Sequence, residues 1–464
     1  MKKIKLLLSL LLAVCVLNFG QSGLSGIGTA TVFAATNTFK GVNWADPNDN
    51  YTTGILYVSG LSSTDTYASA ATVADRVVSQ FVSLLGSNTV RMPINESTVT
   101  NYWSTYTGAI DTALSKGKVI LCYWAAANGK PADMTKYWNM WNTVVSKYGG
   151  NSNCYFEPLN EPYGYSASDL CTLYRTWASN YSSVAKGKII LDGTGYAENL
   201  SAVGADSNLS GCLLGVHDYA FWKTLASEGA WQQDIANIIS SYASRVVVTE
   251  WGAAMTTGKN YNQPSTDNEV CYIRGVGNQL RAMGVGSCYW PGLRDGDSYG
   301  LTKKSGSGSG ISLSVTNTSG LDRLKYAWGD ENVKIKNAAT SMYLDGNGST
   351  GNGADVLQLN SASTTKQQWI IEGTGSSYVR IKNASSGLYL DGLGYSSNGS
   401  NVGQWSDSNS TNQQWTQEVS GSYVMFKNRG SGLYLDGLGY NTNGSLVGQW
   451  SSSGNSNQKW SVTP

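Results

Sequence analysis

Residues 154–162 read Cys154-Tyr-Phe-Glu-Pro-Leu-Asn-Glu-Pro162, an apolar, strand-prone run that ends in Asn-Glu-Pro. Pro162 has no backbone N–H and disfavours the helical conformation for the residue before it, so strand pairing should stop with the Glu161 carboxylate at the strand end. Residues 245–252, Arg-Val-Val-Val-Thr-Glu-Trp-Gly, repeat this arrangement with Glu250, 89 residues after Glu161. Two carboxylates at the ends of two buried strands suggest one general acid/base and one nucleophile.

The two carboxylate runs belong to a longer alternation of strand-like and helix-like segments. The strand-like runs are residues 39–44, 88–94, 118–124, 154–160, 188–193, 213–219, 245–250 and 286–290. Helical patterns lie between them at 71–85, 134–147, 167–185, 228–242 and 267–283. Eight such units over roughly 290 residues predict a (βα)8 TIM barrel of the α/β class, whose strands are buried on both faces. A doubly wound open sheet is the competing arrangement, although it rarely needs eight such even units.

The end of the barrel is marked by a change in composition. Residues 305–310 read Ser-Gly-Ser-Gly-Ser-Gly, which is typical of a flexible linker. Residues 321–328 have the pattern of one more helix, so we interpret the Gly-Ser run as a long loop before the eighth barrel helix. The barrel domain is therefore expected to span residues 36–330.

Residues 331–464 form a threefold internal repeat. Tyr-Leu-Asp-Gly occurs at 343–346, 389–392 and 434–437, with spacings of 46 and 45 residues, and a Gln-x-Trp motif recurs at 367–369, 413–415 and 458–460. Each copy is short, strand-like and rich in Gly, Ser and Asn, so none could bury a core alone. Three copies closing on one another would share one core.

The N-terminus has the pattern of a secretory signal peptide over residues 1–35. Lys2, Lys3 and Lys5 precede an apolar run at residues 6–17, and small residues lead to a cleavage site near Ala34 or Ala35. The apolar run is too short to span a bilayer and no later segment qualifies. We expect a secreted, extracellular protein.

The amino-acid composition limits the classes of ligand and cofactor that this protein is expected to bind. The formal net charge is +1, and loss of the three leader lysines leaves −2, which argues against nucleic acid or an anionic membrane. The 16 Trp and 28 Tyr suit carbohydrate, although a β-rich secreted surface would have the same composition. Cysteine spacing indicates no metal site or compact disulfide framework. His217 is the only histidine, which rules out multi-histidine zinc sites. We expect a monomer without metal or cofactor.

Several motifs together resemble glycoside hydrolase family 5, the cellulase-like branch of the retaining (βα)8 glycosidases. They are Asn160-Glu161-Pro162, Glu250, Asn-Thr-Val-Arg91-Met-Pro and His217-Asp-Tyr219. The resemblance covers residues 36 to about 329. It implies that Glu161 is the general acid/base and Glu250 the nucleophile, and a retaining pair lies about 5–5.5 Å apart.

The same resemblance implies roles for five further residues. Asn160 would bond the sugar 2-hydroxyl, Arg91 would hold Glu250 ionised, His217 and Tyr219 would line the catalytic subsite, and Trp290 would be a platform under the sugar. Arg91 could instead merely neutralise Glu157, and His217 could be an ordinary buried histidine.

Two structural expectations follow from strand geometry. Strict alternation would put Asn160 and Glu161 on opposite faces, so the strand end must twist or bulge. Glu157 shares parity with Glu161 and should point into the barrel toward a polar partner.

Other positions leave the substrate open. Family relatives often place a histidine after the third strand, whereas residues 123–126 are Tyr-Trp-Ala-Ala. Trp44, Trp124, Trp222 and Trp251 either line the cleft or pack inside. A β-glucan is the family default, with galactan and mannan as alternatives.

The threefold repeat resembles the ricin B-type β-trefoil, carbohydrate-binding family 13, an all-β fold. The resemblance implies sugar pockets in the second and third repeats. The second consists of Asp391, Trp405, Asn412 and Gln413, and the third of Asp436, Trp450, Asn457 and Gln458. The first repeat has Asp345 but Leu359 in place of the aromatic residue and Lys366 in place of the Asn, so its pocket should be weak or dead.

These observations predict a secreted retaining endo-β-glycanase that hydrolyses a polysaccharide by double displacement. The paired pockets favour a polymer, since two weak sites on one body gain by avidity. A transglycosidase would share every residue named. A non-catalytic lectin with a degenerate barrel is the alternative of another class.

Overall fold

The structure is a computed structural model that describes residues 36–463 apart from residues 50–51, 126–128, 226, 331, 363, 375–377 and 422. The expected signal peptide, residues 1–35, lies outside the described residues. Among the described residues, no helix combines the length and the apolar composition that a membrane crossing requires. The six described cysteines are all buried and free.

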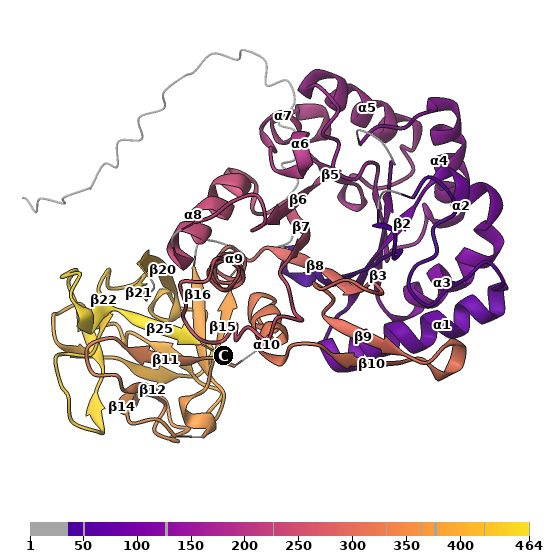
Figure 1. The fold of residues 1–464 in the computed structure, drawn as a ribbon. Helices are drawn as coiled ribbons and strands as arrows, with labels where there is room; N and C mark the ends of the chain where they lie inside the picture. Colours follow the sequence, from indigo (N-terminus) through magenta and orange to yellow (C-terminus); the bar gives the residue numbers. More distant parts are fainter. Residues whose placement is uncertain are drawn as a thin grey trace, which may run out of the picture. The chain divides into compact units, whose positions relative to one another are not determined.

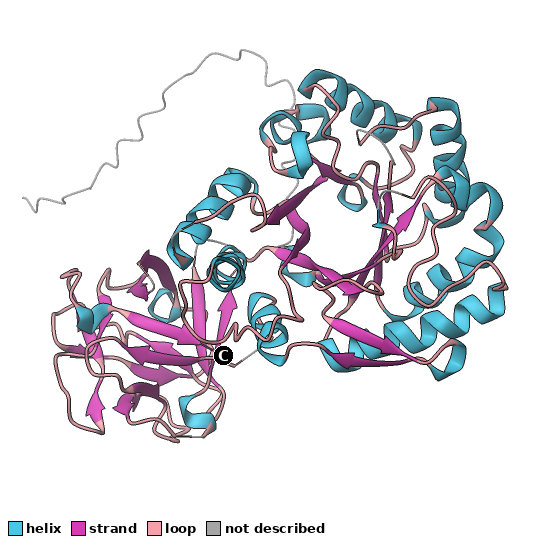
Figure 2. Ribbon diagram, viewed as in Figure 1, coloured by secondary structure: helices cyan, strands magenta, loops and turns pink. Residues whose placement is uncertain are grey.

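Eight parallel strands form one sheet in the order β4-β3-β2-β1-β8-β7-β6-β5. A parallel bridge between Phe156 and Ile189 joins the two ends of that order, so the sheet closes into a barrel. Figure 2 shows the ring of strands with helices around it. The predicted TIM barrel is confirmed, and the open sheet is excluded by the closure. The strands are β1 (Lys40–Trp44), β2 (Thr89–Ile94), β3 (Lys118–Tyr123), β4 (Cys154–Glu157), β5 (Ile190–Asp192), β6 (Leu213–Tyr219), β7 (Val246–Gly252) and β8 (Gly286–Leu293).

Most helices begin at a side chain that caps the free N–H groups of the first turn. Asp133, Ser166 and Asp267 cap α4, α5 and α9 in this way. The predicted helix at 71–85 begins earlier, because Thr66 forms a capping box with Ser69, and its last five residues form a π turn. The helices are α1 (Tyr67–Gln80), α2 (Glu96–Asn101), α3 (Trp103–Lys116), α4 (Met134–Tyr148), α5 (Ala167–Asn180), α6 (Thr194–Ala197), α7 (Ser201–Ala205), α8 (Glu228–Ile239), α9 (Asn268–Met283) and α10 (Thr318–Ala327).

The Gly-Ser run at 305–310 is not the long loop that the sequence suggested. The strands β9 (Thr302–Ser305) and β10 (Ser312–Val315) form an antiparallel hairpin on either side of it. Gly306 and Gly308 turn the chain with φ of 71° and 53°, a region that favours glycine. The run is therefore a hairpin turn, and the predicted helix after it is α10.

The barrel interior changes from apolar to polar along the strands. A buried apolar layer consists of Phe39, Ile120, Tyr155, Ile190, Leu213, Val247 and Cys288. Because inward side chains recur every second residue, Glu157 follows Tyr155 on β4 and His217 follows Leu213 on β6. Both are buried. The polar end is the C-terminal end of the strands, where TIM-barrel sites lie.

The second domain is all-β, with three equivalent sets of strands around one core (Figure 1). The indole N–H groups of Trp369, Trp415 and Trp460 donate to the carbonyl oxygens of Leu344, Leu390 and Leu435 at 2.9–3.1 Å. The predicted β-trefoil is confirmed. Its strands are β11 (Lys334–Asn337), β12 (Tyr343–Asp345), β13 (Ala354–Asp355), β14 (Leu357–Leu359), β15 (Trp369–Gly373), β16 (Val379–Asn383), β17 (Tyr389–Asp391), β18 (Ser400–Asn401), β19 (Gly403–Trp405), β20 (Trp415–Ser420), β21 (Tyr423–Asn428), β22 (Tyr434–Asp436), β23 (Ser445–Leu446), β24 (Gly448–Trp450) and β25 (Trp460–Thr463).

Three buried glutamines tie the repeats into a ring. Gln404 of the second repeat donates to the Gly346 carbonyl of the first, and Gln449 of the third donates to Gly392 of the second. Gln358 of the first donates to Gly437 of the third and closes the ring. Each repeat thus completes the polar core of another, which is why one copy could not fold alone.

Candidate active site

Glu161 lies four residues beyond the end of β4, on a segment whose backbone departs from a strand. Its φ is +46°, a left-handed conformation that costs a non-glycine residue about 1 kcal/mol. Its backbone N–H donates to Asp192 Oδ2 at 3.0 Å, which holds this conformation. The turn resolves the conflict between strand alternation and the need for Asn160 and Glu161 to reach one site.

An irregularity in β7 turns the Glu250 side chain toward the inside of the barrel. Val247 belongs to the inward layer and Val248 to the outer core, so strict alternation would send Glu250 outward. The register between β7 and β8 shifts between Val248 and Trp251, as expected of a bulge. Glu250 consequently bonds groups inside the barrel mouth.

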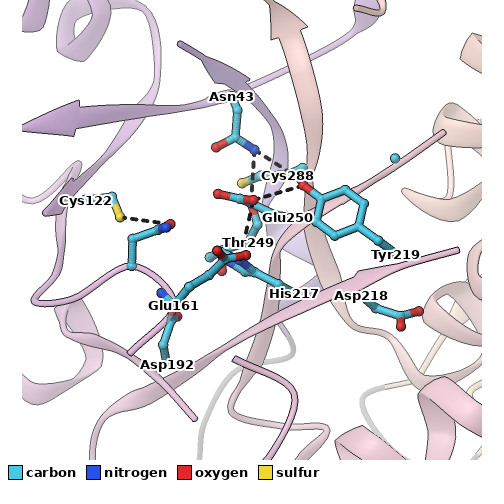
Figure 3. Close-up of polar contacts among 12 residues, drawn as sticks. Asn43, Cys122, Glu161, Asp192, His217, Asp218, Tyr219, Thr249, Glu250 and Cys288 are labelled. Atoms are coloured by element: carbon cyan, nitrogen blue, oxygen red, sulfur yellow. Dashed lines mark hydrogen bonds and ion pairs between the residues drawn. The ribbon is translucent and has the colours of Figure 1, made fainter. Parts of the chain in front are cut away.

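The two carboxylates meet across the mouth of the barrel (Figure 3). One oxygen of Glu161, one oxygen of Glu250 and one ring nitrogen of His217 lie within 4.8 Å of one another. His217 Nδ1 is 2.9 Å from Glu161 Oε1 and 3.4 Å from Glu250 Oε2. In general, a retaining pair of carboxyl groups lies about 5–5.5 Å apart and an inverting pair about 6.5–9.5 Å apart.

Arg91 is the cation shared by the site, and only 2% of it is exposed. Its Nε donates to Glu157 Oε2 at 2.6 Å, and its Nη1 donates to Glu250 Oε1. Its Nη2 donates to Asn160 Oδ1 at 2.6 Å, and its Nη1 also donates to Asn43 Oδ1 at 2.9 Å. Arg91 therefore neutralises Glu157 and holds Glu250 at once, so the two readings of its role are not exclusive.

The environments of the two carboxyl groups differ. Burial raises the pKa of Glu161 to about 7. Burial also raises the pKa of Glu250, but the Arg91 charge opposes the shift, and Arg91 and the Tyr219 hydroxyl donate to its two oxygens. The Tyr219 bond is 2.9 Å long. Two carboxyl groups with such different hydrogen-bond partners are suited to separate acid and nucleophile roles.

His217 is buried against both carboxylates. Burial lowers its pKa to about 4, so the imidazole is neutral at neutral pH. Its Nδ1 bonds Glu161, and its Nε2 lies 3.8 Å from Asp192 Oδ2. A neutral imidazole at this position can donate a hydrogen bond to Glu161 or accept one from it, and it adds no charge to the site.

Asp192, at the end of β5, was missed by the sequence reasoning. Burial and the nearby Glu157 charge raise its pKa well above the usual range, which favours the protonated form. Gly215 on β6 makes room for it, since a Cβ there would lie 2.0 Å from Asp192 Oδ1. An acidic residue closing an apolar run was the signal that identified Glu161, and it applied equally to Asp192.

The four tryptophans that the sequence left either in the cleft or in the core fall into three groups. Trp44 and Trp251 are fully buried and pack in the core. Trp124 lies 5.9 Å from Trp290, ring centre to ring centre, in a cluster that includes Tyr219. Trp222 is exposed.

Among the described residues, two clusters have ligand atoms close enough to hold a metal ion, namely Glu157, Asp192 and His217, and Glu161, His217 and Glu250. In each, the Arg91 guanidinium already bonds one carboxylate. A dication would lie beside this fixed positive charge, so neither cluster is a favourable metal site.

The predicted sugar pockets of the trefoil combine an exposed ring with a buried carboxylate. Trp405 and Trp450 are 40% and 43% exposed. Asp391 and Asp436 are buried, and each accepts the backbone N–H of the residue two positions later at 2.7 Å. In the first repeat, Asp345 makes the same turn, and Leu359 occupies the position of the ring.

The four amide side chains predicted as sugar ligands form two groups, the half-buried asparagines and the fully buried glutamines. Asn412 and Asn457 are half-buried. A Cβ added at Gly394 or Gly439 would lie 3.6 Å from the Nδ2 atom of Asn412 or Asn457, respectively. In the first repeat Lys366 takes the place of the asparagine, and its side chain fills the space that a Cβ at Gly348 would need.

Gln413 and Gln458 are fully buried, and each side chain bonds backbone groups of its own repeat through both amide ends. Gln367 of the first repeat does the same. These glutamines hold together the backbone of their own repeat in all three copies.

Two known families match the chain. Residues 49–292, more than half of its length, match Cellulase (glycosyl hydrolase family 5). Residues 323–405 and 411–464 match the ricin-type beta-trefoil lectin domain-like family. No curated protein sequence matches the chain.

Several solved structures share part of the fold. A designed threefold-symmetric protein, ThreeFoil, is 33% identical over 29% of this chain and 98% of its own, with a TM-score of 0.28. An exo-beta-1,3-galactanase from Clostridium thermocellum is 25% identical over 35% of this chain and 33% of its own, with a TM-score of 0.28. A ricin B-like lectin from Macrolepiota procera, in complex with lactose, is 23% identical over 29% of this chain and 94% of its own, with a TM-score of 0.25. This chain thus spans about a third of the galactanase.

Proposed function

The chain belongs to glycosyl hydrolase family 5 and carries a ricin-type lectin domain, which makes it a glycosidase with a carbohydrate-binding domain, and from this premise we propose that it is a secreted retaining endo-β-glycanase. Its substrate is a polysaccharide, with β-1,4-glucan as the family default. The observation that carries the proposal is the approach of Glu161 and Glu250 to within 4.8 Å across the barrel mouth.

In the first step, a Glu250 oxygen attacks the anomeric carbon while Glu161 donates its proton to the glycosidic oxygen. The bond from the anomeric carbon to that oxygen breaks, the leaving sugar departs as an alcohol, and a glycosyl ester of Glu250 remains. In the second step, Glu161 takes a proton from water, the water oxygen attacks the anomeric carbon, and the ester bond breaks. Two inversions leave the configuration retained.

The surroundings of each residue support these roles. Glu161, whose pKa is raised to about 7 by burial, can hold a proton near neutral pH. Glu250 is oriented by Arg91 and Tyr219, one on each oxygen. Arg91 bonds the amide oxygen of Asn160, which turns its NH2 group away from Arg91 and toward a sugar hydroxyl. Trp290, beside Trp124, offers the platform under the sugar.

The roles of the two carboxylates can be tested separately with azide. Glu250→Ala should lose turnover of an aryl β-glycoside by about 10⁴-fold or more, and azide should rescue it as the α-glycosyl azide. Glu161→Ala should retain the first step with a good leaving group, and azide should give the β-glycosyl azide. The control is Asp75→Ala, an exposed carboxylate on α1.

The competing functions predict other outcomes. A non-catalytic lectin would show no turnover in the wild type, and an inverting enzyme would give the α-anomer first by NMR. A transglycosidase would give longer products in place of reducing ends. Release of reducing sugar from cellulose derivatives, mannan and galactan would identify the backbone.

Secretion has its own test. Expression of the full chain in a secreting bacterial host should place the protein in the medium with an N-terminus near Ala35 or Thr36. Retention in the cell with an intact N-terminus would contradict it.

A further inference from the structure

Asp192 is a buried carboxyl group next to the proposed acid/base, and no step of the proposed mechanism uses it. It is the last residue of β5 and has no exposed surface. Its Oδ2 accepts the backbone N–H of Glu161 at 3.0 Å, and Figure 3 shows the two side chains next to each other. A change at Asp192 would therefore act on the very residue that carries the acid/base carboxyl group.

Glu161 needs such support, because its φ of +46° lies in the left-handed region that favours glycine. The Glu161 carboxyl group is held by His217 Nδ1 at 2.9 Å, and its backbone N–H is held by Asp192. His217 Nε2 in turn lies 3.8 Å from Asp192 Oδ2. Asp192 thus lies beside both groups that set the position of the acid/base.

The second oxygen of Asp192 is in an unusual position for a charged group. Among the residues that the structure describes, no donor bonds the buried Oδ1. This oxygen occupies the space left by the missing side chain of Gly215, where a Cβ would lie 2.0 Å from it. An ionised carboxylate with a buried, unbonded oxygen is costly, and a neutral acid is much less so.

The site has one cation for its buried carboxyl groups. Arg91 pairs with Glu157 and with Glu250. In the described part of the chain, the only ion-pair partner of Asp192 is His217, and burial lowers the pKa of that imidazole to about 4, so it is neutral at neutral pH. A third ionised carboxylate would therefore have no cation of its own.

Glu157 is the partner that a proton on Asp192 would reach. One oxygen of each lies within 4.8 Å of the other, and their side chains form a hydrogen bond, which requires a proton on one of them. Burial raises the pKa of Glu157, but Arg91 outweighs burial and holds this pKa below its usual value. Burial and the Glu157 charge raise the pKa of Asp192. These opposite shifts favour the proton on Asp192.

We propose that Asp192 is a positioning residue for the acid/base: as an uncharged acid it accepts the Glu161 N–H and donates a hydrogen bond to Glu157, and so holds Glu161 where it can protonate the leaving group. This inference rests on the proposed glycosidase function. It predicts that the need for Asp192 follows the need for proton donation. A poor leaving group requires the proton of Glu161, whereas a good leaving group departs without it.

The test uses the full chain and two aryl β-glycosides of the sugar that the wild type accepts, with phenol as the poor and 2,4-dinitrophenol as the good leaving group. Asp192→Leu removes acceptor and donor and should lower kcat/KM on the phenyl glycoside by about 10²-fold, but on the dinitrophenyl glycoside by less than about tenfold. Asp192→Asn keeps an acceptor and a donor without charge and should stay within about threefold of the wild type on both. Asp192→Ala removes the same groups as Asp192→Leu without its bulk and serves if that variant does not fold.

Asp46 provides the matched control. It is equally buried and accepts the backbone N–H groups of Asn48 and Tyr57 at 2.8 Å and 2.6 Å in the loop after β1. Asp46→Leu should lower the melting temperature, and any loss of kcat/KM should be the same for the two glycosides.

The outcomes separate the two proposals. If Asp192→Asn loses as much on the phenyl glycoside as Asp192→Leu, the residue acts as a charged carboxylate and the inference is overturned. Equal losses on both glycosides in Asp192→Leu or Asp192→Ala would leave Asp192 with a structural role only and would also overturn it. Absence of turnover by the wild type on every glycoside would instead defeat the proposed function.

Discussion

The candidate active site of the barrel and the proposed sugar pockets of the trefoil are assembled in opposite ways. In the barrel, Arg91 on β2 meets Glu157 at the end of β4 and Glu250 on β7, which is 159 residues away along the chain. In the trefoil, Asp391, Trp405 and Asn412 lie within one repeat, and the third repeat builds the same set again. A site with one shared cation should fail as a unit, whereas repeated local pockets should fail one at a time.

The largest effect is expected from Arg91→Met. Loss of the cation leaves the buried Glu157 charge uncompensated, which should destabilise the barrel by about 3–5 kcal/mol in denaturant unfolding. Glu250 also loses its cation, so kcat should fall by about 10²-fold or more. Arg76→Met, an exposed arginine on α1, is the control.

A second substitution separates the two roles of Arg91. Arg91→Met with Glu157→Gln removes the uncompensated buried charge and should recover part of the stability. Activity should not return, because Glu250 still lacks its cation. Recovery of both would mean that Arg91 serves Glu157 alone.

The next effect is the pH dependence of kcat/KM. Glu161 must carry a proton to protonate the leaving oxygen, and its pKa is about 7, so activity should fall about tenfold per pH unit above that value. Activity should fall again on the acid side as Glu250 becomes protonated. Glu161→Ala with an aryl glycoside should lose the alkaline limb, and its persistence would assign the limb to another group.

A smaller effect is expected in the trefoil. Trp405→Ala and Trp450→Ala should each weaken binding to an insoluble polysaccharide by less than about tenfold, because the other pocket remains. The double variant loses avidity as well and should weaken binding by about 10²-fold or more. Leu359→Ala, in the repeat without a ring, is the matched control. A single variant that abolished binding would contradict independent pockets.

The smallest effect is a gain. Leu359→Trp with Lys366→Asn restores the ring and the amide of the first repeat and frees the space at Gly348. Binding to the same polysaccharide should improve by less than about tenfold, since the third pocket adds only to avidity. No gain would mean that the first repeat differs in more than these two positions.

Several elements of the fold followed from local pattern to within a few residues, although α3 (Trp103–Lys116) was not predicted. β6 (Leu213–Tyr219) has the predicted bounds, and the start of α4 (Met134–Tyr148) was also correct. Local pattern failed at residues 305–310, where composition suggested a loop and pairing between the flanking strands made a hairpin. A high glycine content indicates that the chain can turn freely. It does not show whether the segments on either side pair as strands.

The site could be predicted only in part. Glu161 and Glu250 were identified from strand-end position, yet Asn43 and Asp192 occupy equivalent positions and were not singled out. Gln413 and Gln458 were predicted as sugar ligands, whereas the structure has them bonded to the backbone beneath the pocket. Sequence gives the type of a residue, and only the surrounding residues decide whether its polar atoms face a ligand or the chain.

The amino-acid sequence by itself determined the alternation of strands and helices, the threefold repeat and the residue types of both kinds of site, because these depend on spacing along the chain. The tertiary structure alone decided that Arg91 serves two carboxylates, that burial raises the pKa of Asp192 and that four rings align beside Tyr219, namely those of Tyr163, Tyr196, Trp222 and Phe221. Those properties depend on distances between residues far apart in sequence and on exclusion of water, which exist only once the barrel has closed.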